Sequence, residues 1–268
     1  MSKLDINNIN IPEKIKKIPM YYYWLFGFIF LTLMIFTAWY IEMRPLGIFT
    51  EIGNVMVFIK GFLEPSFTRI DTYLLACLET LAIALWGTFL AAITAIPLGL
   101  LGASNMSPNS VVYYIVRRIL DLFRAVDILV FALIFVVAVG LGPYSGMMAL
   151  AIHTTGILGK LLSETIESID KGQVEGIKAL GNHHFFVTTY GVIPQVLPNY
   201  LSYVLLRFES NVRAATVVGL VGGGGIGFHL WENMRSFQDS QSSTIILLII
   251  LMVIIIDSLS KKVRERFI

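Results

Sequence analysis

Three charged residues stand close together in a stretch that is otherwise mostly apolar. Arg207, Glu209 and Arg213 lie within the run 195–218. A charge at the centre of a membrane-crossing helix costs about 2.5–3.5 kcal/mol on insertion scales, so such residues usually face an internal path or one another. Guanidinium groups carry a planar fork of donors that suits phosphate-like oxyanions. One interpretation is an anion path; the other is a structural ion pair between Glu209 and Arg213, which stand one helical turn apart.

A run of glycines follows this stretch and consists of Gly222, Gly223, Gly224 and Gly225. Glycine allows unusual backbone angles and the close approach of helices. At membrane depth, irregular backbone is tolerated only where protein or a water-filled cavity covers it. The run therefore predicts either a re-entrant turn that gates the outer end of a path or a simple extracellular turn. It does not predict a nucleotide-binding loop, because no Gly-Lys-Ser/Thr sequence follows it.

The stretch 170–198 is polar, unlike the sequence on either side of it. Ser168 or Asp170 can cap a short helix, and Gly181 can end that helix because glycine tolerates the left-handed turn at a helix terminus. A polar segment of this length between membrane spans is longer than most connectors. We expect the helix to lie outside the bilayer and to offer a compact surface to a soluble partner.

Membrane spans are the elements that must position these residues. The chain has 268 residues, of which 56% are hydrophobic and 14% charged, whereas about 25% is usual for a soluble domain. We expect an all-α fold with six transmembrane helices, the second of them broken near Pro97 and Gly99. The expected spans are 21–41, 72–101, one long helix over 111–142, 143–162, 195–218, and 244–256 with its flanks. An interfacial helix is expected around Ile52–Leu63.

The distribution of basic residues sets the orientation. Six spans place both termini on one side, and most of the lysines and arginines, including those of 170–190, fall on that side. Cytoplasmic loops are enriched in Lys and Arg, so we expect the termini and the polar segment in the cytoplasm. The expected divisions are a cytoplasmic segment, first span and outside loop over 1–71, a transmembrane domain over 72–260, and a basic cytoplasmic tail over 261–268.

Five further residues have candidate roles. Cys77, the one cysteine, lies in an apolar run and is expected to be inert packing. Glu79 is expected to pair with a basic residue of another span, with Arg207 as one candidate. His153 either lines a path or is satisfied by a neighbour. His183 and His184 are better explained by solvated or partner-facing roles than by metal binding, and no metal-ligand spacing occurs.

A known family pattern occurs in the polar segment. Glu175-Gly176-Ile177, then Gly181, then Gly191-Val192-Ile193-Pro194 resembles the EAA loop of ATP-binding-cassette (ABC) importer permeases. In that family the loop is a cytoplasmic coupling helix that docks into a groove on the ATPase subunit. The resemblance implies a coupling helix at about 170–185. The residues it assigns to ATPase coupling are Glu175, Gly176, Ala179, Gly181 and Pro194.

Further motifs are similar to those of phosphonate-type importer permeases. They are Arg117-Arg118-Ile119-Leu120-Asp121, Arg124-Ala125, Gly140-Leu141-Gly142-Pro143, Gly156-Ile157-Leu158-Gly159-Lys160, Glu164 with Glu167, and Arg207-x-Glu209-Ser210-Asn211-x-Arg213-Ala214-Ala215-Thr216 running into Gly222–Gly227. The resemblance implies a type I importer fold and a cargo that is phosphonate, phosphite, phosphate or a phosphate ester. The substrate path would include Arg207, Glu209, Asn211, Arg213 and Thr216.

The same resemblance implies the partners and cofactors. They are a second copy of the permease in a homodimer, two ATPase subunits that carry ATP and Mg, an extracytoplasmic substrate-binding protein, and the lipid bilayer. It implies no nucleic acid, no catalytic residue, no metal and no cofactor bound by this chain. The alternatives are a permease for another small solute, an ion channel or a membrane enzyme. An enzyme needs clustered reactive side chains, whereas the four histidines are scattered, and a channel does not need a polar cytoplasmic helix.

Overall fold

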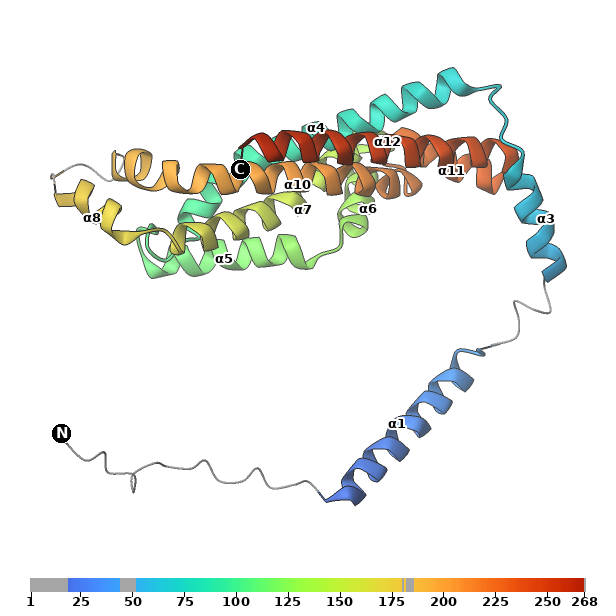
Figure 1. The fold of residues 1–268 in the computed structure, drawn as a ribbon, viewed down its shortest axis with the longest axis horizontal. Coiled ribbons are helices and arrows are strands. Elements are labelled where there is room, and N and C mark those ends of the chain that lie inside the picture. Colours follow the sequence, from blue (N-terminus) through green and yellow to red (C-terminus); the bar gives the residue numbers. More distant parts are fainter. Residues whose placement is uncertain (1–18, 44–51, 180, 182–185, 268) are drawn as a thin grey trace, which may run out of the picture. The chain divides into compact units, whose positions relative to one another are not determined.

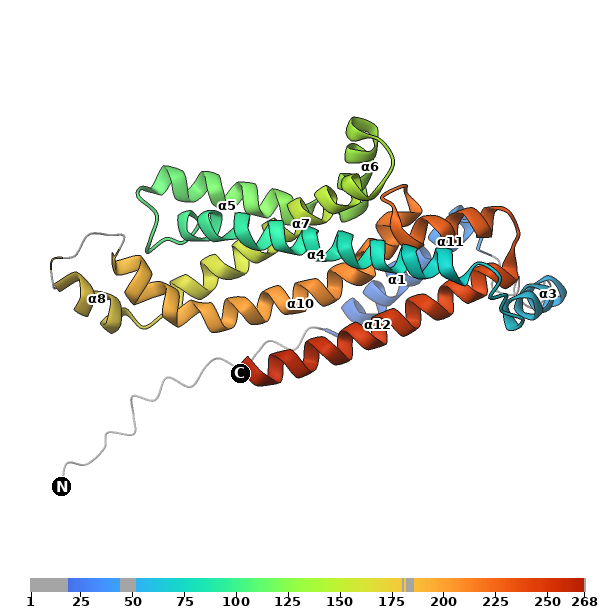
Figure 2. The ribbon, with the colours of Figure 1, turned by 90° about the horizontal axis from the view of Figure 1, so that it is seen from above.

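A computed structural model describes residues 19–43, 52–179, 181 and 186–267, and throughout those residues the regular elements are helices (Figures 1 and 2). The expected cytoplasmic segment over 1–18 and the residues His183 and His184 lie outside this part of the chain. Contacts divide the chain into two units, 1–57 and 58–268, which are described separately.

In the first unit, helix α1 (Met20–Tyr40) confirms the helix expected at 21–41. None of its residues is buried. At 1.5 Å per residue its 21 residues extend about 30 Å, the thickness of the hydrocarbon core of a bilayer. A helix of this length that is apolar on every side is typical of a membrane span. Helix α3 (Ile52–Leu63), which begins in the first unit and ends in the second, confirms the helix expected around these residues.

The second unit is a bundle with helix α7 at its centre. Helices α4, α7 and α10 contact one another and lie side by side in Figure 2. Helix α7 contacts α4, α5, α6 and α10, while α12 packs on α10 and α4. The bounds are α4 (Ile70–Leu101), α5 (Ser110–Ala125), α6 (Ile128–Val139), α7 (Pro143–Glu167), α8 (Lys171–Ala179), a π-helical turn η2 (Val187–Val192), α10 (Ile193–Leu220), α11 (Gly225–Arg235) and α12 (Asp239–Phe267).

Helix α7 can carry polar residues because its neighbours shield them. More than half of its 25 residues are buried, among them Ser145, Thr154 and Ser163. Glycines let the neighbouring helices approach: a Cβ built on Gly156 would lie 2.6 Å from the Cβ of Phe123 on α5. Small residues at such contacts are typical of membrane bundles, where packing replaces the hydrophobic effect between helices. A helix enclosed by protein does not need an apolar surface.

The third expected span is not one long helix. Helices α5 and α6 meet at an angle of 91°, because Val126 and Asp127 leave the helical conformation (ψ 128° and 146°). Asp127 then caps α6, and its Oδ1 accepts the N–H of Leu129 at 2.8 Å. On the other side of the bend, the ring of His153 in α7 contacts the carbonyl of Val126. These contacts replace the backbone bonds that a continuous helix would make there.

The second expected span is not broken near its end. Helix α4 continues through Pro97 to Leu101. Gly99 lies against Leu162 of α7, and a Cβ built on it would be 2.8 Å from the Cδ2 atom of that side chain. Neighbouring helices allow membrane helices to keep a proline inside, and here the packing on α7 holds the last turn of α4.

Four helical segments of the described chain are long and apolar enough to cross a membrane, and the bent pair α5–α6 adds a fifth if it forms one span. The four are Met20–Tyr40, Ile70–Leu101, Val187–Arg235 and Asp239–Glu265. Helix α7, the fourth expected span, is not among them, since its own composition is too polar. The described chain is therefore that of an all-α membrane protein, and helix α7, expected from the sequence over 143–162, is enclosed by its neighbours.

Candidate translocation path and coupling surface

Arg213 of α10 contacts two carboxylates. Its Nη1 atom lies 3.0 Å and 3.2 Å from the two carboxylate oxygens of Asp257, and its Nη2 atom lies 3.3 Å from Oε1 of Glu209. The Glu209–Arg213 pair confirms the prediction from their spacing. Asp257 was not predicted, although an acid directly after the apolar run 244–256 was a signal for a partner on another helix. The three side chains tie α10 to α12.

Arg207 differs from Arg213 in having no such partner. Its side chain is half-buried in α10, and among the described residues no carboxylate lies within ion-pair distance and none of the hydrogen bonds involves it. Glu209 and Asp257 together exceed the charge of Arg213 by one negative unit. Arg207 is therefore the charged side chain of α10 that is available to an anion or to a group from another chain.

Asn211 and Thr216 lie inside the bundle, away from the exposed side on which Arg213 lies. The buried amide of Asn211 donates to the hydroxyls of Thr88 (2.8 Å) and Thr154 (3.0 Å), which joins α10 to α4 and α7. Thr216 donates to the carbonyl of Val212 within α10, and its own carbonyl lies against Gly227 of α11. In this single protomer, these two members of the predicted path act in helix packing.

The glycine run forms the connection between α10 and α11. Gly222, Gly224 and Gly225 have φ values of +97°, +79° and +72°, which side-chain-bearing residues rarely adopt. Helix α4 supplies acceptors for the first free N–H groups of α11: Glu79 Oε1 accepts from Gly225 (3.0 Å) and Thr80 accepts from Ile226 (2.8 Å). The expected pairing of Glu79 with a basic residue such as Arg207 is wrong, because the free amides of a helix N-terminus take its carboxylate instead.

A cavity of about 240 Å³ opens beside this connection. The connection between α6 and α7 forms a second wall, where the N–H of Gly142 donates to the carbonyl of Gly222 at 2.9 Å. The lining residues are Glu79, Leu141, Gly142, Pro143, Gly222, Gly224, Gly225, Phe228 and His229. Protein thus covers the irregular backbone, as membrane depth requires.

The polar segment forms helix α8 at one end of the bundle (Figure 1). As expected, Asp170 caps it, with Oδ1 accepting the N–H of Gly172 at 2.9 Å. Gly181 follows with φ +72°, the left-handed conformation expected of a glycine that ends a helix. Of the remaining residues assigned to coupling, all four are exposed: Glu175, Gly176 and Ala179 on α8, and Pro194 in the first turn of α10.

The opposite face of α8 holds the segment against the bundle. Val174 is buried and Ile177 half-buried. Both pack near Gly191 of η2, where an added Cβ would meet the Cδ1 atom of Ile177 at 3.2 Å. The side chain of Gln195 adds a polar tie, since its Oε1 accepts the N–H of Asp170 and its Nε2 donates to the carbonyl of Gly191. Helix α8 is thus fixed on one face and free on the other.

Comparison with known proteins identifies this architecture. Residues 95–267 match the protein family described as "Binding-protein-dependent transport system inner membrane component". The chain belongs to this family. HtxC of Stutzerimonas stutzeri, which is assigned to phosphite transport, is 36% identical over 85% of this chain and 81% of its own length. PhnE2 of Escherichia coli K12, assigned to a cryptic phosphonate transport system, is 56% identical over 46% of this chain and 100% of its own length.

The fold agrees with this family. A chain of the MetNI methionine ABC transporter, solved in inward-facing conformations, superposes with a TM-score of 0.66 at 17% identity, covering 76% of this chain and 99% of that one. Together with the family match and the sequence relatives, this makes the protein a multi-pass membrane protein of a bacterial transport system and the permease subunit of an ABC importer. Members of this family function with an ATPase and a substrate-binding protein.

The permease shows no grouping for metal chemistry in its described residues, where no three His, Cys, Asp or Glu side chains come together. His153 is satisfied by the carbonyl of Val126 at 3.1 Å, which confirms the second of its two interpretations. Cys77 is buried in the core, as expected. The polar groups of α8, α10 and the glycine connection are therefore the candidates for coupling and for the substrate path.

Proposed function

We propose that this permease carries phosphonate or a related phosphorus oxyanion into the cell, with Arg207 as a contact of the substrate. Arg207 carries the proposal, because it is the cation of α10 that no carboxylate of the described chain neutralises. A dehydrated oxyanion needs replacement donors, and the guanidinium fork supplies two of them to one phosphoryl group. HtxC and PhnE2, two relatives of this chain, are assigned to phosphite and phosphonate transport, which supports the same substrate class.

Arg213 has a different part in this proposal. Asp257 occupies one edge of its guanidinium group and Glu209 approaches the other, so few donors are left for a passing anion. The ion pairs of Arg213 with Asp257 and Glu209 keep the local positive charge low, which favours release of the anion. The site then attracts the anion through one arginine and avoids a tight two-arginine trap. Asn211 and Thr216 act by holding α10 in place, and the glycine connection Gly222–Gly225 is proposed as the outer gate.

The proposed assembly is a homodimer with six spans in each copy and both termini in the cytoplasm. Domain limits at 1–71, 72–260 and 261–268 belong to the same proposal. In α10 the side chain of Arg213 is 45% exposed, and a second copy would cover this charged surface from lipid. ATP and Mg would be bound by two ATPase subunits, which the exposed face of α8 would contact, and hydrolysis would take place there.

Reconstitution tests the substrate class directly. The permease is co-expressed with its ATPase and binding protein, and uptake into proteoliposomes is measured with methylphosphonate, phosphite and phosphate, with sulfate as the control. We expect ATP-dependent uptake of at least one phosphorus oxyanion and none of sulfate. Uptake confined to an unrelated solute would leave an importer permease but remove the proposed substrate. Passive flux without ATP would instead indicate a channel.

A substitution at Gly181 tests the coupling role of α8. The left-handed conformation costs a residue with a side chain about 1–2 kcal/mol, and space is not the problem, since an added Cβ meets nothing within 4 Å. We expect Gly181→Val to reduce substrate-stimulated ATP hydrolysis and uptake while membrane insertion is unchanged. Gly181→Asn is the matched control, because asparagine tolerates this conformation. Full activity of the valine variant would contradict a coupling role for this turn.

A further inference from the structure

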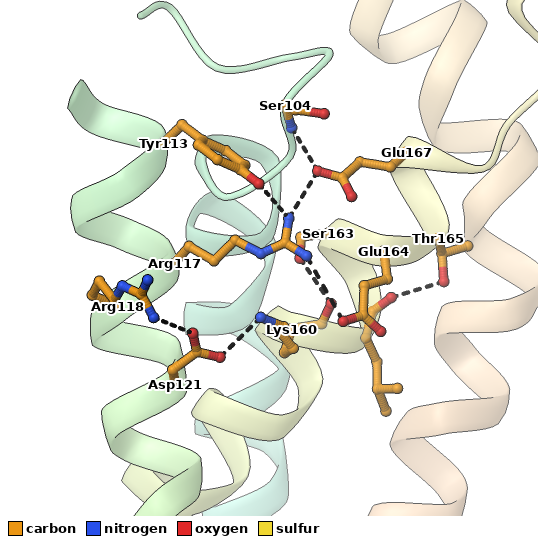
Figure 3. Close-up of polar contacts among 11 residues, drawn as sticks. Ser104, Tyr113, Arg117, Arg118, Asp121, Lys160, Ser163, Glu164, Thr165 and Glu167 are labelled. Atoms are coloured by element: carbon orange, nitrogen blue, oxygen red, sulfur yellow. Dashed lines mark hydrogen bonds and ion pairs between the residues drawn. The ribbon is translucent and has the colours of Figure 1, made fainter. Parts of the chain in front are cut away.

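A second polar cluster joins α5 to the last turns of α7 (Figure 3). Arg117 of α5 reaches across to α7, where its Nη1 atom lies 2.9 Å from Oε1 of Glu167 and its Nη2 atom lies 3.9 Å from Oε1 of Glu164. The same Nη1 donates to the hydroxyl of Tyr113 one turn earlier (2.9 Å), and the guanidinium carbon lies 5.4 Å from the centre of that ring. Arg117 is thereby oriented by its own helix and directed at α7.

The connection between α4 and α5 joins the same cluster. The N–H of Ser104 donates to the oxygen of Glu167 that Arg117 also contacts (2.8 Å), and the amide of Asn105 donates to the carbonyl of Ile166 (2.8 Å). One turn before Glu164 in α7, Lys160 contacts Asp121 of α5 at 2.8 Å. Two separate parts of the chain, α5 and the α4–α5 connection, therefore converge on the last turns of α7.

The position of this cluster in the chain gives it consequences for α8. Glu167 is the last residue of α7, and α8 begins at Lys171. Beyond that junction, Gln195 of α10 holds the N–H of Asp170. The orientation of α8 relative to the bundle thus depends on η2 and α10 on one side and on whatever fixes the end of α7 on the other.

Arg118, the next residue of α5, provides a built-in comparison. Its side chain is 81% exposed and pairs with Asp121 of its own helix at 3.7 Å, whereas that of Arg117 is 21% exposed. The two arginines have the same charge and adjacent places in the sequence. Of the two, Arg117 is the one whose ion pairs in the described structure reach α7.

We propose that Arg117 is a positioning residue for the coupling surface, holding Glu167 and with it the end of α7 so that α8 meets the ATPase in one orientation. This inference rests on the proposed contact of α8 with the ATPase. An isolated, exposed ion pair would contribute little to stability. Here the pair spans two helices, is shared with a backbone N–H and lies next to the element that would move, so its loss changes the direction of α8 as well as the packing of α5.

A photo-crosslinker at the exposed position of Ala179 reports on that orientation without depending on the substrate. In the complete complex, the yield of permease–ATPase crosslink and the rate of ATP hydrolysis are measured for the parent protein, Arg117→Gln and Arg118→Gln. We expect Arg117→Gln to lower the yield and the hydrolysis rate by about tenfold, within the range reported for residues that modulate coupling. The Arg118→Gln complex should match the parent.

Two further variants separate positioning from folding. Arg117→Lys keeps the charge but loses the fork, so its yield should be intermediate, and it carries the test if Arg117→Gln does not assemble. The charge-exchanged pair Arg117→Glu with Glu167→Arg should recover part of the yield that either single change loses. Equal yields for the parent and the Arg117 variants would overturn this inference alone. Absence of any ATPase crosslink in the parent would overturn the proposed coupling role and this inference with it.

Discussion

Replacing Arg207 by lysine is expected to lower uptake of the phosphorus oxyanion by about tenfold to a hundredfold, the equivalent of one hydrogen bond to a charged group at 1.5–3 kcal/mol. Lysine keeps the positive charge but presents a point charge in place of the planar fork. Because Arg207 has no carboxylate partner among the described residues, the substitution should not strand a buried acid. The variant permease should therefore insert and assemble as the parent does.

The measurement is ATP-dependent uptake into proteoliposomes that contain the complete transporter, with assembly checked by gel filtration in detergent. Arg235→Lys is the matched control, since this residue is exposed at the last turn of α11 and takes no part in the proposed path. Parent-like uptake by an assembled Arg207→Lys complex would make Arg207 a structural residue and remove the anion contact from α10.

Substitution of Arg213 by alanine is expected to remove most of the assembled permease. Asp257 and Glu209 would both lose their cation, and an unpaired charge in a membrane-crossing helix is costly, by about 2.5–3.5 kcal/mol where it lies at the helix centre. Breaking an ion pair by removing one partner is much more harmful than removing all of its charges. The Arg213→Ala variant should therefore show a loss of folded and assembled permease, in addition to any loss of transport.

Removal of all three charges provides the control for Arg213. The variant Arg213→Ala, Glu209→Gln, Asp257→Asn has no stranded acid, and we expect its assembled amount and thermal stability in detergent to recover most of the loss. Persistent failure of this neutral variant would indicate that the contact between α10 and α12 needs the guanidinium group itself. Parent-like assembly of Arg213→Ala alone would show that the carboxylates are solvated, contrary to the reasoning above.

The pattern of apolar runs and charges along the sequence predicted the helices well, but it predicted ion-pair partners only within one helix. The apolar runs at 21–41 and 72–101 appear as α1 and α4 because a bilayer requires about 20 apolar residues to cross it. Glu209 and Arg213 were paired correctly, since their spacing places them on one face of any helix. Asp257 stands 44 residues further along the chain, and no local rule relates two positions on different helices.

The bend at Val126 is a feature of the backbone that local sequence rules likewise did not predict. Arg117, Asp121, Arg124 and Asp127 have the spacing of a helical stripe, and an apolar run follows, so periodicity predicts one continuous helix. The helix ends at this point because Asp127 caps a new one and His153 of α7 binds the released carbonyl of Val126. Neither contact is visible in a periodic pattern. Asp127 can either continue a helix or cap a new one, and periodicity does not distinguish the two, while His153 comes from a distant segment of the chain.

The sequence alone determined that this chain is a helical membrane protein with a polar helical segment between apolar stretches, since hydropathy and charge act on each stretch separately. It also placed a left-handed turn at Gly181, a property of one residue. Only the tertiary structure decided which polar residues pack and which remain available. Asn211 is satisfied by Thr88 and Thr154, Arg213 by Asp257, and Arg117 by Glu167, whereas Arg207 is left without a partner in the described chain. The physical reason is that neutralising a charge or a hydrogen-bonding group requires a partner within about 3 Å, and the folding of separate helices against one another supplies that distance.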